Sequence, residues 1–394
     1  MATMKRVYLD NNATTPLAPE VFEAMKPYLL EDYGNASSIH WFGQRAKNAV
    51  EKARQQVARL LNARPGEVIF TSGGTEADNA AIFGIVQAAR VANPHIITTR
   101  IEHHAVLNSA QALEKNSVEV TYLGVGNQGV VDPADVRSAI RPETVLISVM
   151  HANNEIGTIQ PLEEIGAIAR ERDVYFHTDA VQSAGKVPID VEKLGVDLLS
   201  LSAHKLNGPK GAGVMYIRRG TALRPLLYGG HHERDRRPGT ENVPGIVGLG
   251  MAAELAWACL GEYGQRVAAL RDRLERGVVE LVPQVRVNGD LQHRLPNTSN
   301  LSFECVEGEG FVIAMDLKGF ACSTGAACSS GSVEPSHVLS AIGCTPEQAR
   351  SSIRFSLGRY TSEEDIDATL AAVPAVVERL RSVSPRYKAL GTRV

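Results

Sequence analysis

The sequence predicts an α/β fold in which a large domain, built on a mostly parallel sheet flanked by helices, precedes a smaller C-terminal α/β domain. Two observations predict it. Short apolar runs alternate with helical segments through the first half of the chain, a pattern typical of parallel sheets with helices on both faces. A polar cluster follows most of these runs, as expected where such sheets bind ligands. At 394 residues the chain is also too long for one ordinary core, so we expect two domains.

The first elements are a strand-like entry and two helices. Residues 8–15, YLDNNATT, run from a short strand into polar turn residues. A helix is expected over 19–30, a loop over 34–38 and a long helix over 39–62. The long helix is amphipathic, because its Arg and Lys residues fall on one face and its apolar residues on the other.

Residues 67–81, EVIFTSGGTEADNAA, carry the first chemical signal. We expect a strand at 68–70, a tight turn at Gly73-Gly74 and a helix over 75–89. Free backbone N–H groups and the positive end of a helix dipole then meet at one point, which suits a phosphate. The glycine pattern is neither GxGxxG nor a Walker loop, and Thr75 with Asp78 also fits an ordinary capping box.

Four further apolar runs predict strands, and each delivers a polar cluster at its end. The runs are 95–101, 145–150, 174–176 and 196–201, and a helix is expected over 161–172. The clusters are, in order, Glu102–His104, His151–Glu155, His177–Gln182 and Ser202–Lys205. Their convergence at one sheet edge predicts a ligand site there.

Lys205 lies just beyond the last of these strands, in SAHKLNGPKG. Burial at a strand end would lower the pKa of its amine and make it a nucleophile toward an aldehyde. From this segment alone a solvated loop lysine is the more common interpretation, since lysines are rarely buried. The other clusters favour the reactive lysine.

These residues suit a phosphate-bearing aldehyde cofactor, pyridoxal phosphate. Lys205 would form its Schiff base, and Thr75 with Ser202 and His204 would hold its phosphate. Asp179 would pair with the ring nitrogen, which keeps the ring an electron sink. A histidine at the end of the neighbouring strand would lie against the ring and shuttle protons.

The C-terminal part predicts the smaller domain. A basic loop, HHERDRRPGTEN, is followed by a helix over about 247–282 and strands at 285–287, 300–303 and 352–356. Residues 321–332, ACSTGAACSSGS, have few large side chains and predict a mobile loop that carries Cys328. We expect the large domain over 15–260 and the small domain over 261–394 together with 1–14.

Composition argues against several classes of protein. The formal net charge of −3 indicates neither a nucleic-acid nor a membrane partner. No apolar run reaches the roughly 18 residues of a transmembrane helix, and the N-terminus resembles no targeting segment, so we expect a cytoplasmic protein. The five cysteines include no CxxC pair, which argues against a disulfide framework or a zinc ribbon. They are Cys259, Cys305, Cys322, Cys328 and Cys344.

The motifs together resemble those of the NifS/IscS cysteine desulfurases, which are class V aminotransferases and fold-type I pyridoxal-phosphate enzymes. They include LDNNATT, TSGGTEADN, EHHAVL, HANNEIGT, HTDAVQSAGK, SAHKLNGPKG, RRPGTEN, STGAACSSGS and SSIRFSLGRYT. The match keeps its order from Tyr8 to the final helix, and HTDAVQ and RLPNT favour the NifS-like members.

The resemblance implies roles around the cofactor ring. Lys205 is the Schiff-base lysine and the base that takes the substrate's α-proton, and His103 stacks on the ring and handles protons. Asp179 holds the ring nitrogen, while Gln182 and Asn154 contact the ring's oxygen side.

The resemblance also implies a phosphate site, a substrate site and partners. The phosphate would be bound by Gly74, Thr75, Ser202, His204 and, from the partner subunit of a homodimer, Thr240. Arg354 would bind the substrate carboxylate with both arms of its guanidinium, and Asn154 would assist it. Cys328 would attack the sulfur of L-cysteine, leaving alanine and an enzyme persulfide for an iron–sulfur scaffold or another sulfur acceptor. No resident metal is expected, although Cys328 is a candidate transient ligand of an iron–sulfur cluster.

The sequence departs from the family pattern in places and leaves alternatives open. Ala203 replaces the usual glycine between Ser202 and His204, which should leave the phosphate contacts intact. Cys322 is expected to be a buried structural residue rather than a second sulfur relay. Another fold-type I activity, selenocysteine lyase or aminotransferase, and a non-catalytic sulfur carrier are the alternative functions. A mobile Cys328 argues against transamination, which needs no thiol.

Overall fold

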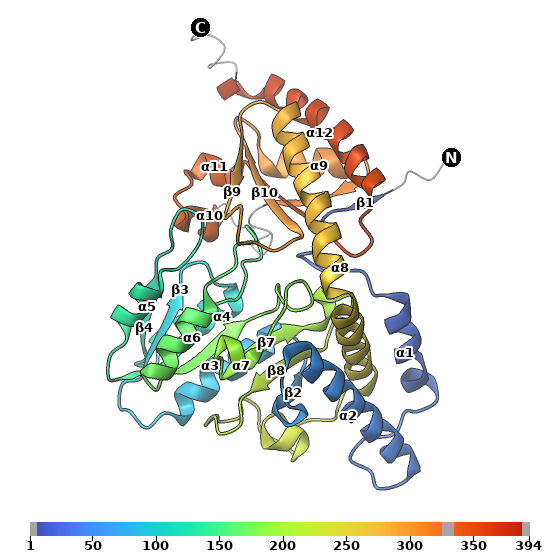
Figure 1. The fold of residues 1–394 in the computed structure, drawn as a ribbon, viewed down its shortest axis with the longest axis vertical. Coiled ribbons are helices and arrows are strands. Elements are labelled where there is room, and N and C mark those ends of the chain that lie inside the picture. Colours follow the sequence, from blue (N-terminus) through green and yellow to red (C-terminus); the bar gives the residue numbers. More distant parts are fainter. Residues whose placement is uncertain (1–5, 325–334, 388–394) are drawn as a thin grey trace.

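A seven-stranded sheet forms the centre of the larger part of the molecule (Figure 1). The structure is a computed structural model that describes residues 6–324 and 335–387. Along the sheet the strands lie in the order β2 (Val68–Thr71), β8 (Gly213–Ile217), β7 (Leu198–Ser202), β6 (Tyr175–Asp179), β5 (Thr144–Ser148), β3 (His95–Thr99) and β4 (Glu119–Leu123). The five strands from β7 to β4 are parallel, whereas β8 runs antiparallel to both neighbours. This confirms the predicted mostly parallel sheet.

Alternate side chains of each strand face opposite helical layers, which explains why the strands are apolar throughout. Ile96, Leu146 and Leu198 pack with helices α3 (Gly74–Ala88) and α4 (His104–Glu114). Their neighbours Ile97 and Ile147 face the other layer. That layer contains α1 (Pro19–Leu30), α2 (Trp41–Leu61), α6 (Leu162–Glu171) and the first half of α8 (Val243–Leu281).

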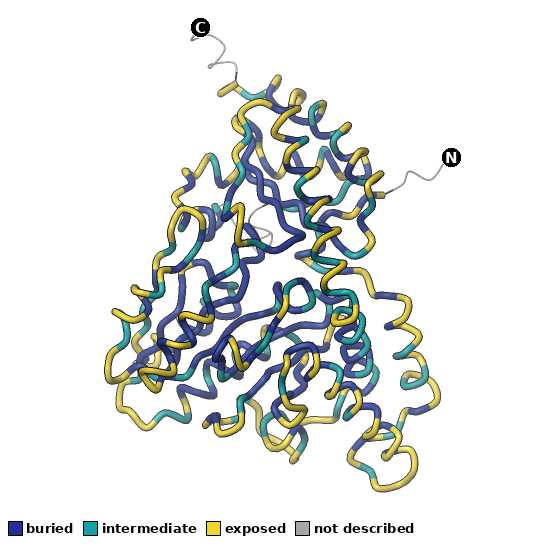
Figure 2. Tube along the Cα trace, viewed as in Figure 1, coloured by how far each residue is buried: buried dark blue, intermediate teal, exposed yellow. Residues whose placement is uncertain are grey.

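Short elements complete this part of the chain. They are α5 (Pro133–Ala139), α7 (Val191–Leu194) and the 3₁₀ turns Pro65–Glu67, Ala203–Lys205 and His232–Asp235. Buried strands at the centre and exposed outer helix faces are visible in Figure 2. Strands β4 and β8 are absent from the expectations above. β4 lies at the sheet edge and is half exposed, so it lacks the apolar run that marks the inner strands.

The smaller part is built on an antiparallel sheet. Its order is β12 (Ser323–Thr324), β13 (Ser352–Ser356), β10 (Thr298–Phe303) and β9 (Val285–Asn288). A separate pair joins β1 (Val7–Tyr8) to β11 (Phe320–Ala321) in parallel. The helices are α9 (Gly308–Asp316), α10 (His337–Ala341), α11 (Pro346–Arg350) and α12 (Glu363–Val383). The first residues of the predicted 321–332 loop therefore belong to strands; most of that loop, Cys328 included, lies outside the described residues.

Helix α8 connects the two parts (Figure 1). It begins earlier than predicted because Asn242 caps it, its side chain accepting from Gly245 N, with Pro244 in the first turn. By length and composition α8 could cross a membrane, but core helices pass the same test, and Leu249, Ala252 and Ala253 are buried against α1 and α2. The domain boundary after residue 260 stays a prediction, and it falls within this helix.

Candidate active site

A cavity of about 300 Å³ lies at the carboxyl edge of the parallel strands. Predicted site residues from distant parts of the sequence line it together: Gly74, Thr75, His103, Asn154, Asp179, Gln182, Ser202, His204, Lys205 and Arg354. Asn12, Ala13, Asp78, Met150, Ala152 and Val181 complete the lining and were not predicted. Thr240 is exposed and is not among the lining residues. Cys328 lies outside the described residues.

Lys205 reaches the cavity from the 3₁₀ turn that follows β7. Its Nζ donates to the backbone oxygens of Asn12 at 2.5 Å and Ala13 at 2.8 Å. The residue is half-buried, so the burial expected at the strand end is only partial. The N-terminal segment therefore fixes the amine at the cavity wall, which the strand-end argument did not anticipate.

His103 caps helix α4 and lies near Lys205 in the cavity lining. Its Nδ1 accepts from Ala105 N at 3.1 Å, which leaves Nε2 as the protonated nitrogen of the neutral ring. Burial, with the nearby positive charge of Lys205, lowers the pKa of His103 to about 4. The ring is therefore neutral near pH 7, with a proton on Nε2 that it can donate.

Asp179 ends strand β6 and is buried in the cavity wall. Val181 N donates to its Oδ1 at 2.8 Å. Burial raises the pKa of Asp179 to about 6, while Lys205 opposes the shift. Asp78 on α3 lies close to it, and burial and the Asp179 charge hold the pKa of Asp78 well above its usual range. Of the two carboxyl groups, Asp179 is thus the one that ionises near neutral pH.

The N-terminus of α3 forms one end of the cavity. Its cap, Gly73, makes no side-chain capping bond, so the predicted capping box with Thr75 is not formed. A side chain on Gly74 would place a Cβ 2.7 Å from Val181 Cγ2, so this close approach requires glycine. Uncapped N–H groups lie beside Thr75 and Ser202 at this end of the cavity, an arrangement that suits an anion.

His204 stands at this same end. Its Nδ1 contacts Thr14 Oγ1 at 3.1 Å. Burial and the charges of Lys205, Lys210 and Lys186 lower the pKa of His204 to about 4. Its neutral ring can therefore donate a hydrogen bond from Nε2 to an anion.

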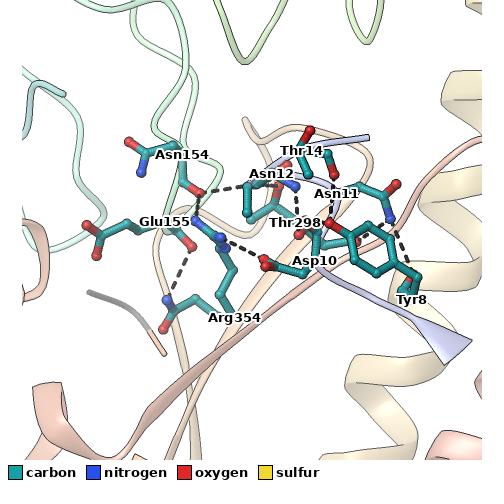
Figure 3. A network of polar contacts seen from close by, with 12 residues as sticks. Tyr8, Asp10, Asn11, Asn12, Thr14, Asn154, Glu155, Thr298 and Arg354 are labelled. Carbon is teal, nitrogen blue, oxygen red and sulfur yellow. Dashed lines mark hydrogen bonds and ion pairs between the residues drawn. The ribbon is translucent and has the colours of Figure 1, made fainter. Parts of the chain in front are cut away.

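Arg354 approaches from β13 of the smaller part and is only 1% exposed. One of its terminal nitrogens donates to the Asn154 backbone oxygen at 3.0 Å, and the other pairs with Asp10 at 2.8 Å (Figure 3). Its Nε is buried without a partner among the described residues. These two bonds hold the guanidinium in place, and the Nε–H is among the N–H donors that they leave unused.

Asn12, which sequence reasoning did not assign, lies at the centre of these contacts. Its Nδ2 donates to Thr298 Oγ1 at 2.8 Å and to the Asn154 oxygen at 3.1 Å (Figure 3). Its backbone oxygen accepts from Lys205 and from Gln182 Nε2, the latter at 3.0 Å. The motif LDNNATT contained this residue, but only the folded chain brings it to Lys205.

Three of the four described cysteines have thiols that are harder to ionise than a free thiol. Cys322 is buried among apolar residues, and burial raises the pKa of its thiol to about 12. Burial also raises the pKa of Cys305 and of Cys344. A thiolate nucleophile is therefore not found among these three. The described residues contain no cluster of three or more potential metal ligands.

Comparisons with known proteins agree with this arrangement. The aminotransferase class-V family model matches residues 7–369. Cysteine desulfurase IscS of Dictyoglomus turgidum is 53% identical over 386 residues, covering 98% of each chain. A solved NifS-like protein superposes with a TM-score of 0.90 at 39% identity, covering 95% of this chain and 100% of its own.

A second solved structure, SspA in complex with cysteine, has a TM-score of 0.81 at 39% identity. It covers 91% of this chain and 100% of its own. The family match spans most of the chain, and the relatives named here span nearly their full lengths. The chain therefore belongs to the class-V aminotransferase family, with cysteine desulfurases among its relatives.

Proposed function

We propose that this protein is a cysteine desulfurase, which removes sulfur from L-cysteine and releases L-alanine. The C–S bond of the substrate breaks, its β-carbon keeps the electron pair and takes up a proton, and an S–S bond forms to the thiol sulfur of Cys328. The observation that carries the proposal is the meeting of Lys205, Asp179 and the uncapped α3 N-terminus in one cavity.

Pyridoxal 5′-phosphate is the cofactor that this cavity fits. The α3 N-terminus with Thr75, Ser202 and His204 would bind its phosphate, and Asp179 its ring nitrogen. When bound, the cofactor supplies an electron sink for the substrate's α-carbon. A positive ring nitrogen beside Asp179 would lower the pKa of this carboxyl and keep it ionised.

The chain's own residues then divide the work on the substrate. Lys205 holds the cofactor aldehyde and removes the proton from the α-carbon of cysteine. His103, neutral because of its lowered pKa, donates a proton from Nε2. Arg354 binds the substrate carboxylate through its unused Nε and a terminal nitrogen.

Cys328 is the proposed sulfur acceptor of the enzyme. Cys322 is a poor substitute because its thiol is buried and its pKa is about 12. The persulfide on Cys328 would pass to an iron–sulfur scaffold or another acceptor protein in the cytoplasm.

The protein is proposed to act as a homodimer. Large apolar side chains are exposed where α1 leads into α2: Ile39 is 94% exposed, and Tyr33 and Trp41 are exposed beside it. A second copy would cover such a patch. Thr240 does not line the cavity of its own chain, which agrees with a role at the cavity of the partner.

The test is to reconstitute wild type and Cys328→Ala with pyridoxal 5′-phosphate and to supply L-cysteine with a thiol reductant. Wild type should bind the cofactor, turn yellow and release sulfide and alanine in equal amounts. Cys328→Ala should keep the yellow band and change spectrum with cysteine, yet release almost no sulfide.

Other outcomes decide against the proposal. Sulfide release by Cys328→Ala at the wild-type rate would exclude Cys328 as acceptor. Amino-group transfer to a keto acid without sulfide would indicate an aminotransferase. Activity on selenocysteine but not on cysteine would indicate a lyase.

A further inference from the structure

Lys186 is a buried amine beside the cavity that the proposed reaction does not use. It follows β6 by seven residues and is only 5% exposed. Its Nζ donates to Gln182 Oε1 at 3.0 Å and to Asn12 Oδ1 at 3.2 Å. Burying an amine is costly unless its hydrogen bonds are made, and both acceptors here are amide oxygens of residues that line the cavity.

These bonds determine which way the Gln182 amide points. The oxygen accepts from Lys186, so the nitrogen is directed to the Asn12 backbone oxygen at 3.0 Å. An amide nitrogen has two N–H donors, and this bond uses one. The other is available to the cavity. Were the amide reversed, its oxygen would face the Asn12 oxygen, which cannot donate.

The same hydrogen-bond network includes Lys205, the proposed reactive lysine. The Asn12 oxygen that accepts from Gln182 also accepts from Lys205 Nζ at 2.5 Å. Lys186 holds the Asn12 side chain from one side and Asn297 Nδ2, at 2.9 Å from Asn12 Oδ1, holds it from the other. Asn12 therefore links the two lysines through a single residue.

We propose that Lys186 is a positioning residue for the cofactor: it fixes the Gln182 amide with its nitrogen toward the cofactor ring and holds Asn12 against Lys205. The inference rests on the proposed function. It does not depend on the charge of Lys186. Burial, Lys205 and Arg354 place the pKa of Lys186 well below its usual value, yet a neutral amine has two N–H donors for its two acceptors.

The experiment is a double-mutant cycle with pyridoxal 5′-phosphate as the ligand. Lys186→Met, Gln182→Ala and the double variant are compared with wild type for the cofactor dissociation constant and absorption maximum. Each single variant should weaken binding about tenfold, and the double variant little more than either, because both remove the same contact. Lys193→Met is the matched control: this lysine, seven residues further along the chain, is exposed and pairs with Glu163 on the surface.

The outcomes separate this inference from the proposed function. If wild type fails to bind the cofactor, the proposed function is wrong. If wild type binds the cofactor and Lys186→Met binds it equally well, Lys186 does not act through Gln182. The same conclusion follows if the double variant binds about a hundredfold more weakly than wild type, because the two effects are then independent. Melting temperatures of the cofactor-free proteins report on folding. Should Lys186→Met not fold, Lys186→Gln, whose shorter side chain cannot reach both acceptors, enters the same cycle with the same decisive outcomes.

Discussion

At the scale of single residues, three buried carboxyl groups with different environments stand out. Burial raises the pKa of Asp179 to about 6 and that of Glu102 to about 8, and it raises the pKa of Asp78 strongly. Only Asp179 is therefore charged to a large extent near pH 7. This agrees with the proposal that Asp179 pairs with the ring nitrogen, since a second buried anion beside it would be costly.

Glu102 leads to a prediction for the pH dependence of stability. Its Oε1 accepts from Thr99 Oγ1 and Met150 N, while Oε2 is buried without a partner among the described residues. The pKa of Glu102 is about 8 in the folded protein, against a usual 4.5. At low pH the group is therefore protonated in both the folded and the unfolded state, and it does not destabilise the fold. The cost develops as the pH rises from about 4.5 to 8.

Glu102→Gln should therefore raise the melting temperature relative to wild type increasingly between pH 5 and 8.5. The expected gain in unfolding free energy is on the order of 2 kcal/mol at the highest pH of this range. The exposed Glu164→Gln is the control and should show no such trend. A difference between Glu102→Gln and wild type that is the same at both pH values would contradict the assigned pKa.

Most site residues could be predicted from the sequence because each follows a buried strand. Asp179 ends β6, while Lys205 and His103 follow β7 and β3 by a few residues, so the parallel strands bring all three to one edge of the sheet. Asn12 and Lys186 could not be assigned in this way. Their roles depend on a hydrogen bond between residues far apart in the sequence, and no local pattern encodes that contact.

At the scale of elements, the contact between α2 and α8 depends on a missing side chain. A Cβ on Gly250 would lie 2.6 Å from Ala53 Cα, whereas one on Gly261 of the same helix would meet nothing within 4 Å. Gly250→Ala should lower the unfolding free energy by about 1–3 kcal/mol. Gly261→Ala should raise it by about 0.5–1 kcal/mol, because alanine favours helix. Denaturant unfolding of the two variants is the measurement. Equal changes in their unfolding free energies would contradict this packing.

The basic loop after Gly230 is anchored by a buried ion pair. Glu233 accepts two bonds of 2.8 Å from Arg54 on α2 and one of 2.9 Å from Phe70 N on β2. Glu233→Ala would leave Arg54 charged and buried, which should lower the unfolding free energy by about 3 kcal/mol.

Glu51 provides a matched control because it pairs with the same Arg54 from a position where its side chain is only half-buried. Glu51→Ala should cost about 0.5 kcal/mol. Thermal unfolding of both variants is the measurement. If Glu233→Ala loses no more stability than Glu51→Ala does, the ion pair does not anchor the loop. The sequence indicated a basic loop here but not this anchor, since the acidic partner of Arg54 lies far along the chain.

At the scale of the whole molecule, the exposed residues Ile39 and Trp41 predict the dimer. Ile39→Asp should shift the sedimentation equilibrium toward monomer, because it places a charge in the proposed contact. Leu317→Asp is the control: Leu317 is 76% exposed but lies in the smaller part of the molecule. Wild type sedimenting as a monomer, or both variants dissociating alike, would contradict the proposed interface.

The central claim is that Lys205 holds the cofactor in the cavity at the carboxyl edge of the sheet. The most direct measurement is to load the protein with pyridoxal 5′-phosphate and reduce the lysine–cofactor Schiff base with borohydride. The labelled peptide is then mapped by mass spectrometry. Lys186, Lys205 and Lys210 are the lysines nearest to the site that peptide mapping must distinguish. We predict the label on Lys205 alone. A label on Lys186 or Lys210, or a protein that takes up no label, would contradict the account.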